Sequence, residues 1–262
     1  MFKPIKRIFD FILSLLAIII LSPLFIFVAI LVRLNLGSPV LFRQKRVGQY
    51  NKVFTLYKFR SMRVAFDNDG NLLPDDQRLT KFGLFLRKTS IDELPQLFNI
   101  LFGQMTIIGP RPKTIFETLL MQNTSYVYRT AIKPGLSSWS VIHGRNNIRN
   151  DAALTYDLEH VARDSFGLDV KIFLKTILMV LKGSGISTEG HATFLHLSDF
   201  LLEHKLMTKE QVVSLRQQSL EVERQKLKYI PLEITKHDFI SKRREFRKIK
   251  KNFTPQATPT WE

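Results

Sequence analysis

The sequence contains no cysteine, and this absence excludes disulfide bonds, thiolate catalysis and metal sites with cysteine ligands. A chain without cysteine is compatible with a reducing compartment such as the cytoplasm, although composition alone does not establish one. Internal repeats are also absent. With 262 residues, the chain has room for one substantial core, or for one domain with appendages.

Acidic residues are scarce: 23 Asp and Glu stand against 39 Lys and Arg, which gives a net charge of +16. Such an excess favours an anionic partner, either an acidic lipid, a phosphorylated substrate or a nucleic acid. The sequence carries no recognised nucleic-acid-binding motif, and aromatic residues are seldom interleaved with its basic runs. We therefore expect no nucleic-acid partner.

The segment from residue 8 to residue 32 is almost entirely apolar, interrupted only by Asp10, Ser14, Ser22 and Pro23. As a helix, this segment of about 25 residues would be roughly 37 Å long, enough to cross the hydrocarbon core of a membrane. It is too long for a cleavable signal peptide, and no small-residue cleavage site follows it. The segment predicts a membrane anchor within residues 1–36.

The topology of this anchor has two interpretations. Basic residues flank both of its ends, and basic residues prefer the cytoplasmic side of a membrane. Ser22 and Pro23 lie near its middle, where proline bends a helix. The chain either enters the membrane, breaks at Ser22-Pro23 and leaves by the same face, or crosses as a kinked helix. The charge and proline rules alone favour the kinked helix.

Beyond the anchor, the sequence predicts an α+β fold that is mostly helical. Residues 40–42 and 53–57 have the composition of short strands and predict a β-hairpin. Residues 67–78 are rich in Asp, Asn, Gly and Pro and predict a loop, followed by helices over 80–87 and 94–101. Residues 170–182 combine a lysine stripe with a broad apolar surface, which fits an amphipathic helix at a membrane interface or a helix packed on the core.

Asp92 and Glu93 form an acidic pair just downstream of Arg87. Adjacent carboxylates repel one another, so a folded site that keeps them together must stabilise their charge. A helix is expected to begin at or next to the pair, since Pro95 fits only a first turn, and such a helix end favours the ionised carboxylate. An ionised carboxylate binds a divalent cation or attacks phosphorus. The alternative is helix capping, by a Ser90-Glu93 capping box or by Asp92 as N-cap.

Arg111 lies between Pro110 and Pro112. The two prolines stiffen the backbone and forbid a helix, so the guanidinium is presented from a rigid turn suited to binding phosphate. The alternative is an ordinary proline-rich surface turn.

In their order along residues 1–194, these segments resemble the bacterial sugar transferases, the monotopic phosphoglycosyl transferases that act on polyprenol phosphate. The resemblance covers the compact catalytic core of that family, without the extra membrane domain of its larger members. The matching segments are the anchor with Ser22-Pro23, residues 37–48, 57–62 and 87–97, Gly109-Pro110-Arg111-Pro112, Lys133-Pro134-Gly135 and Gly144-Arg145-Asn146.

The resemblance implies a reaction. A phosphosugar moves from a UDP-sugar to polyprenol (undecaprenyl) phosphate, UMP is released, and glycoconjugate or polysaccharide assembly begins. Asp92 would be the nucleophile that forms a covalent phosphosugar intermediate, Glu93 would complete the catalytic pair, and Mg²⁺ would bind at Asp92. The residues expected to bind substrate are Arg111, Lys58, Arg60, Arg87, Arg145, Pro110 and Pro112.

The resemblance also implies a location and a sugar class. The anchor would be a re-entrant helix broken at Ser22-Pro23 with both ends cytoplasmic, in a bacterial cytoplasmic membrane that contains anionic lipids. Residues 185–194 resemble the branch of the family that acts on N-acetylated amino sugars. Asp157 matches a family position where a structural role is expected. The chain departs from the usual family pattern at Gln104, at residues 134–138 and at His143.

The expected organisation is an anchor at 1–36, a catalytic domain at 37–194 and a basic helical C-terminal extension at 195–262 whose role the sequence does not identify. The competing function is a membrane-anchored scaffold that binds acidic lipids or partner enzymes without catalysis. A scaffold has no need of Asp92, so that residue separates the two functions.

Overall fold

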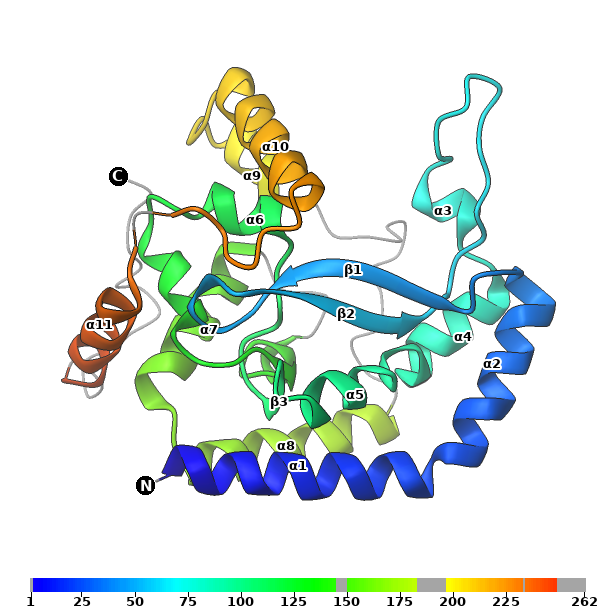
Figure 1. The fold of residues 1–262 in the computed structure, drawn as a ribbon, viewed down its shortest axis with the longest axis horizontal. Coiled ribbons are helices and arrows are strands. Elements are labelled where there is room, and N and C mark those ends of the chain that lie inside the picture. The colour runs from blue at the N-terminus through cyan, green and yellow to red at the C-terminus, as the bar shows by residue number, and fades with distance from the viewer. Residues whose placement is uncertain (1, 145–149, 183–196, 233, 249–262) are drawn as a thin grey trace.

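The structure is a computed structural model that describes residues 2–144, 150–182, 197–232 and 234–248 (Figure 1). It is mostly helical with a small β-hairpin, which confirms the predicted α+β class. The helices and strands are α1 (Phe2–Ile20), α2 (Ser22–Leu36), β1 (Leu41–Val47), β2 (Val53–Phe59), α3 (Asp75–Arg78), α4 (Lys81–Thr89), α5 (Gln96–Leu101), β3 (Thr106–Ile108), α6 (Ile115–Leu120), β4 (Gly135–Ser137), α7 (Asn150–Arg163), α8 (Phe166–Lys182), α9 (Leu197–Glu203), α10 (Lys209–Arg224) and α11 (Lys236–Lys248).

The apolar N-terminal segment forms two helices, α1 and α2, with a bend of 63° between them at the predicted Ser22-Pro23 position (Figure 1). Pro23 lies in the first turn of α2, where its missing N–H removes no helical hydrogen bond. The Ser22 hydroxyl donates to the carbonyl of Ile19 at 2.8 Å. Within the described residues, neither helix alone has the length and apolar character to cross a membrane, whereas the bent pair together has both.

Both helices of the bent pair are attached to the same domain. Near the start of α1, the Lys6 ammonium lies 2.6 Å from an Asp169 carboxylate oxygen. On α2, Val28, Val32 and Leu36 pack against side chains of β2 and α4. The opposite side of α1 exposes large apolar residues, which are Ile8, Phe9, Ile12, Leu16, Ile19 and Ile20.

The β-hairpin is longer than the sequence predicts. β1 and β2 pair antiparallel from Leu41–Phe59 to Val47–Val53, so the paired region includes the basic residues of β1 that periodicity alone does not assign to a strand. A second, two-stranded sheet was not predicted: β3 and β4 pair in parallel through Thr106–Gly135 and Ile108–Ser137. Three-residue strands are too short to show a pattern in the sequence.

Helix α8 begins four residues earlier than predicted, and its two sides differ. Ile172 is fully buried, whereas its exposed apolar residues are Phe166, Val170, Phe173, Leu174, Ile177 and Leu178. The predicted loop at 67–78 contains the single helical turn α3 at its end.

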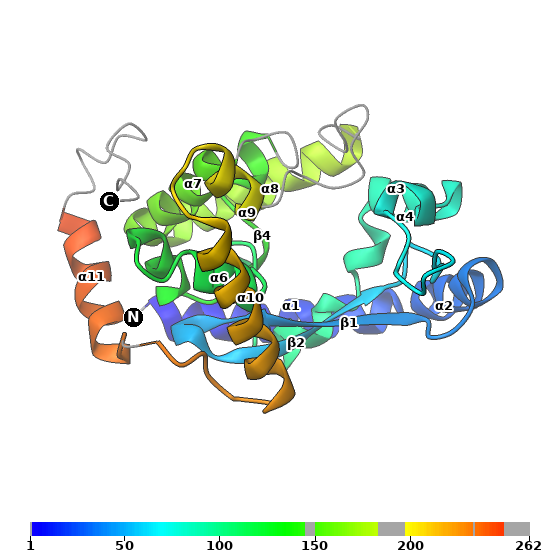
Figure 2. The same cartoon turned by 90° about the horizontal axis from the view of Figure 1, so that it is seen from above.

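The described part of the C-terminal extension is helical, as predicted, and packs on α6 and α7 (Figure 2). Helix α10 opens with a capping box at Thr208 and Gln211 and lies against α6. The linker after α10 bonds to the hairpin tip, because Val53 N donates to Lys228 O at 2.9 Å and Ile230 N donates to Asn51 O at 3.1 Å. The extension therefore braces the end of the hairpin opposite Lys58.

We predict opposite effects of alanine at two helical glycines. In α4, a Cβ on Gly83 would meet the Ser61 carbonyl oxygen at 1.7 Å, so Gly83→Ala should destabilise the protein by about 1–3 kcal/mol. In α8, a Cβ on Gly167 would meet no atom within 4 Å, so Gly167→Ala should stabilise it by less than about 1 kcal/mol. Thermal unfolding of both variants in detergent measures the difference. Equal stability of the two variants would contradict the close contact between α4 and Ser61.

Candidate active site

The acidic pair lies in a 3-10 turn, Ile91–Glu93, between α4 and α5. The expected capping box is not formed there. The Ser90 side chain makes no cap hydrogen bond to this turn, and Glu93 N donates instead to the Ser90 carbonyl at 3.1 Å. Helix α5 begins only at Gln96, so neither carboxylate lies at its first residue. The pair is therefore not helix punctuation, and the capping interpretation is wrong.

Glu93 is held by two cations. Its Oε1 atom accepts from Lys58 Nζ at 2.8 Å and from an Arg111 guanidinium nitrogen at 2.6 Å. Burial alone would raise the pKa of Glu93, but the charges and hydrogen bonds of Arg111 and Lys58 outweigh it and hold that pKa well below its usual range. Two of the predicted substrate-binding residues are thus bound to the acidic pair itself. We call this arrangement of Glu93, Lys58 and Arg111 the Glu93 clamp.

The carboxylate of Asp92 has different surroundings, although Asp92 is adjacent to Glu93 in the sequence. It is only 6% exposed, and among the described residues its carboxylate makes no hydrogen bond or ion pair. Burial, together with the charge of Glu93, raises its pKa to about 6, against the opposing attraction of Lys58, Arg87 and Arg111. The expectation that a helix end favours ionisation of Asp92 is wrong, because desolvation and a neighbouring carboxylate dominate.

The turn that carries Arg111 is as rigid as its prolines predict, and backbone contacts fix it further. Its carbonyls are hydrogen-bond acceptors from three separate elements. Gly135 N donates to Pro110 O at 2.9 Å, and the Arg129 guanidinium donates to Arg111 O. From β1, the Arg46 guanidinium donates to Pro112 O at 3.2 Å, and Val47 N donates to Lys113 O at 2.9 Å. The turn also depends on two glycines, since a Cβ on Gly109 would lie 2.3 Å from the Lys133 carbonyl oxygen and a Cβ on Gly135 would lie 2.1 Å from the Gly109 amide nitrogen.

Arg129 and Asp157 hold this turn from behind. Arg129 Nε donates to an Asp157 carboxylate oxygen at 2.9 Å, and both side chains are buried. The same guanidinium donates to the Arg111 carbonyl. The structural role expected for Asp157 is confirmed by this ion pair. Arg129 was not among the predicted residues, and its only signal in the sequence is an arginine within the mostly apolar segment 126–132.

The remaining predicted cations are placed differently. Arg87 contributes to the electrostatic environment of Asp92 and donates from Nε to the Ser61 hydroxyl at 3.0 Å. Arg60 is not brought to the acidic pair, because its guanidinium donates to the carbonyls of Leu36, at 3.4 Å, and Ser38, at 2.9 Å. Arg60 thereby fixes the connection between α2 and β1. Arg145 and residues 185–194 lie outside the described residues.

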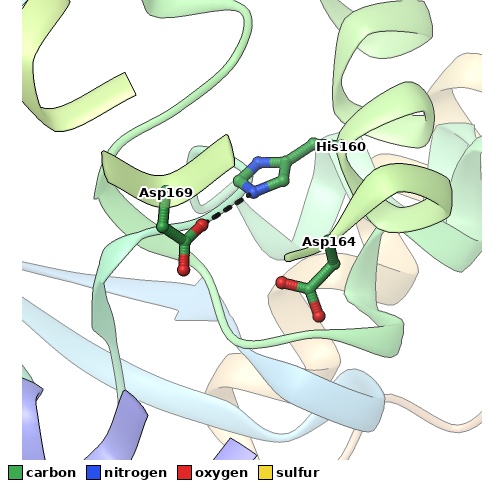
Figure 3. A group of neighbouring side chains, drawn as sticks. All are labelled: His160, Asp164 and Asp169. Carbon is green, nitrogen blue, oxygen red and sulfur yellow. Dashed lines mark ion pairs between the residues drawn. The ribbon is translucent and has the colours of Figure 1, made fainter. Parts of the chain in front are cut away.

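His160, Asp164 and Asp169 form the one group of three metal-type ligands found within the described residues, with ligand atoms within 4.8 Å of one another. Figure 3 shows Asp169 directed at the imidazole, whose Nε2 lies 3.5 Å from Asp169 Oδ1. Both carboxylates already have cationic partners, since Asp169 pairs with Lys6 and Asp164 pairs with Arg243. The group therefore ties α1 and α11 to the α7–α8 connection.

Comparison with known proteins identifies the family. The profile of the bacterial sugar transferase family matches residues 1–183. The chain is 43% identical over 189 residues to an uncharacterized sugar transferase, EpsL, of Bacillus subtilis, covering 72% of this chain and 93% of that protein. The protein belongs to the bacterial sugar transferase family, and the predicted enzyme class is confirmed at that level.

Two further relatives carry more specific names. The chain is 39% identical to a UDP-N-acetylgalactosamine-undecaprenyl-phosphate N-acetylgalactosaminephosphotransferase of Aeromonas hydrophila, over 69% of this chain and 44% of that protein. It is 38% identical to a UDP-glucose:undecaprenyl-phosphate glucose-1-phosphate transferase of Xanthomonas campestris pv. campestris, over 67% of this chain and 38% of that protein. The chain thus spans less than half the length of these two relatives.

The raised pKa of Asp92 predicts that neutralising this residue stabilises the fold at neutral pH. A carboxyl whose pKa rises on folding costs no stability below its unfolded value near 3.8, and costs the full amount above its folded value of about 6. Asp92→Asn should therefore unfold at a higher temperature than the natural protein at pH 8, by a free-energy difference on the order of 3 kcal/mol at most. The difference should shrink as the pH falls from about 6 to below 4. A constant difference across this range would contradict the assigned ionisation.

Proposed function

We propose that the protein transfers a sugar 1-phosphate from a UDP-sugar to polyprenol (undecaprenyl) phosphate through a covalent Asp92-phosphosugar intermediate. The observation that carries the proposal is that the two neighbouring carboxylates differ in their contacts. Glu93 is bound by two cations, whereas Asp92 has a carboxylate without a hydrogen-bond partner among the described residues. A carboxylate that is not engaged in ion pairs is the better nucleophile, and of the two carboxylates Asp92 is the one without such contacts.

The first step forms one bond and breaks one. An Asp92 carboxylate oxygen attacks the phosphorus that carries the sugar, the diphosphate P–O bond breaks, and UMP leaves with that electron pair. In the second step, an oxygen of the polyprenol phosphate attacks the same phosphorus, and the Asp92 carboxylate is released. Asp92 loses its proton above a pKa of about 6, so the nucleophile is ionised at neutral pH.

Attack of an anion on a diphosphate requires nearby positive charge, because phosphoryl transfer depends on positioning and charge stabilisation. Arg87, Lys58 and Arg111 supply it around Asp92. Arg111 is nearly half exposed, at 42% of its side chain, so its guanidinium can bind Glu93 and still face a substrate phosphate. Five N–H donors in a planar fork allow both contacts.

The acidic pair also fits Mg²⁺. This ion is bound in proteins by one or two carboxylates together with substrate phosphates, and Asp92 presents the oxygens such a site needs. Asp92 would hold the ion, with Glu93 beside it, and the ion would supply neutralisation of the diphosphate charge. The cationic side chains would orient the phosphates and exclude water.

The proposed sugar class is an N-acetylated amino sugar, and the proposed product starts glycoconjugate or polysaccharide assembly. The sequence similarity of residues 185–194 to the amino-sugar branch supports this choice. Overall identity does not decide it, since relatives named for N-acetylgalactosamine and for glucose match at 39% and 38%.

The proposed location is the cytoplasmic face of a bacterial membrane, with α1 and α2 as a re-entrant anchor and α8 in the headgroup region with anionic lipids. The ion pair of Lys6 with Asp169 and the packing of α2 on β2 and α4 support a re-entrant path. A spanning helix would separate its two ends by about 30 Å of hydrocarbon, whereas both helices here contact one folded domain. The exposed apolar residues of α8 support the interfacial position.

The reaction is tested with the purified protein, Mg²⁺, undecaprenyl phosphate and a panel of UDP-sugars. The natural protein should release UMP with a UDP-N-acetylhexosamine and become labelled by the sugar phosphate. Asp92→Asn should abolish both signals, because the amide is not a nucleophile. The control Glu223→Gln removes one exposed carboxylate on α10 and should retain both. Full turnover by Asp92→Asn would overturn the mechanism, whereas no turnover by the natural protein with any UDP-sugar of the panel would favour the scaffold function.

The topology is tested by single cysteines, which are unique labels because the chain has none. Cysteines placed at Lys3 and at Lys52 should react with a membrane-impermeant maleimide from the cytoplasmic face alone. Labelling of the two positions from opposite faces would show that the anchor crosses the membrane.

A further inference from the structure

A cavity of about 250 Å³ lies between the first turns of α1 and the catalytic domain. Its charged lining comes from Lys6, Arg7, Asp10, Lys133 and Asp164, and Pro4 and Ile132 contribute apolar surface. None of the residues of the Glu93 clamp lines it, and neither does Asp92. The cavity is therefore separate from the proposed active site.

Most polar groups of this cavity already have partners. Lys6 donates to the Ile108 carbonyl at 2.7 Å and pairs with Asp169. Asp10 accepts from the Thr106 hydroxyl at 2.7 Å and from the Ile107 amide at 3.0 Å.

Two further charges of the lining are also engaged. The Arg7 guanidinium donates to the carbonyls of Ile100 and Leu101, both at 2.7 Å. Asp164 pairs with Arg243 from the C-terminal extension.

Lys133 differs from the other charged residues of the lining. It is half-buried, and among the described residues its ammonium group has no hydrogen bond and no ion pair. Burial lowers its pKa, the positive charges of Arg7 and Lys52 lower it further, and only Asp10 opposes them. A lysine placed among other cations, without a counter-ion, creates a site that favours an anion.

The charge of the lining indicates what kind of anion fits. Lys6, Arg7 and Lys133 stand against Asp10 and Asp164, which leaves one positive charge in excess. The ion-pair partners behind the lining, Asp169 and Arg243, cancel one another. A ligand with a single negative charge would neutralise the cavity, and a phosphodiester carries one such charge.

The position of the cavity indicates where the rest of the ligand lies. Its lining includes the first turns of α1, and the same helix exposes Ile5, Ile8 and Phe9 beside them. Phe166 at the start of α8 lies against Phe9 in a tilted arrangement, with ring centroids 6.3 Å apart, and is itself exposed. An apolar surface therefore adjoins the mouth of a monocationic cavity, which is the arrangement that a phospholipid matches.

We propose that this cavity binds the headgroup of an anionic phospholipid, with the Lys133 ammonium paired to its phosphodiester and the acyl chains on the exposed apolar side of α1. Such a lipid would hold the start of the anchor to the catalytic domain in addition to the Lys6–Asp169 pair. The proposal rests on the membrane location proposed above but not on the chemistry at Asp92.

The test counts lipids bound to the full-length protein by native mass spectrometry from a non-ionic detergent. The probes are dihexanoyl phosphatidylglycerol, dihexanoyl phosphatidylcholine and inorganic phosphate. The natural protein should bind the phosphatidylglycerol at least about tenfold more tightly than either of the others, as expected for a charge-assisted contact in a partly buried site. Equal binding of inorganic phosphate would show a site for a free anion, and equal binding of phosphatidylcholine would show apolar association only. Either result would overturn the proposal.

Three variants locate the site. Lys133→Gln should lose the preference for phosphatidylglycerol, and Lys133→Arg should keep it, which separates loss of charge from loss of folding. The control Lys45→Gln removes the same charge from the hairpin, where Lys45 bonds to Thr55, and should bind as the natural protein does. Unchanged binding by Lys133→Gln would overturn the assignment. Asp92→Asn should also bind normally, so failure of the reaction and failure of the lipid site can be told apart.

Discussion

The Glu93 clamp is the interaction on which the arrangement of the site depends. Lys58 comes from the end of β2, Arg111 comes from the turn after β3, and both reach the same carboxylate oxygen. A buried carboxylate without partners is costly, so closing this clamp brings two distant segments to the acidic pair. It also separates the two carboxylates chemically. Glu93 takes the hydrogen bonds and stays ionised, whereas Asp92 is attracted by the same cations but remains unbonded and titrates near pH 6.

The clamp is only as rigid as the turn that presents Arg111. That turn is held through its carbonyls, which accept from Arg129, Arg46 and the amide of Gly135. Arg129 is in turn fixed by the buried carboxylate of Asp157 on α7. In the proposed reaction, the Arg111 guanidinium would contact Glu93 and a substrate phosphate at once, and a backbone held in place favours this because preorganised charge needs no reorganisation during the reaction.

The sequence predicts those parts of this structure that depend on local chemistry. The anchor and its break follow from an apolar run with Ser22-Pro23, and the rigidity around Arg111 follows from two prolines. The state of Asp92 could not be derived in this way, because its pKa depends on burial and on Lys58, which is 34 positions away in the chain. Arg129 was missed for a related reason: its partners are a carbonyl and a carboxylate on other elements, and no spacing rule links them. Arg60 was grouped with the site by its motif, yet its hydrogen bonds hold the end of α2.

The anchor and the acidic pair are linked more closely than their separation in sequence indicates. Ile91 and Leu94, which flank the pair, pack against the cluster formed by Val28, Val32 and Leu36 of α2. On the other side, α5 follows the pair directly and lies against α1. As a helix of six residues, α5 is only about 9 Å long. The segment that carries the acidic pair thus contacts α2 directly and is linked to α1 through α5. In the proposed membrane location, the depth of α1 and α2 would therefore set the height of Asp92 above the bilayer. The proposed reaction between a soluble nucleotide sugar and a lipid phosphate needs that height to match the headgroups, and direct packing would fix it without a flexible linker.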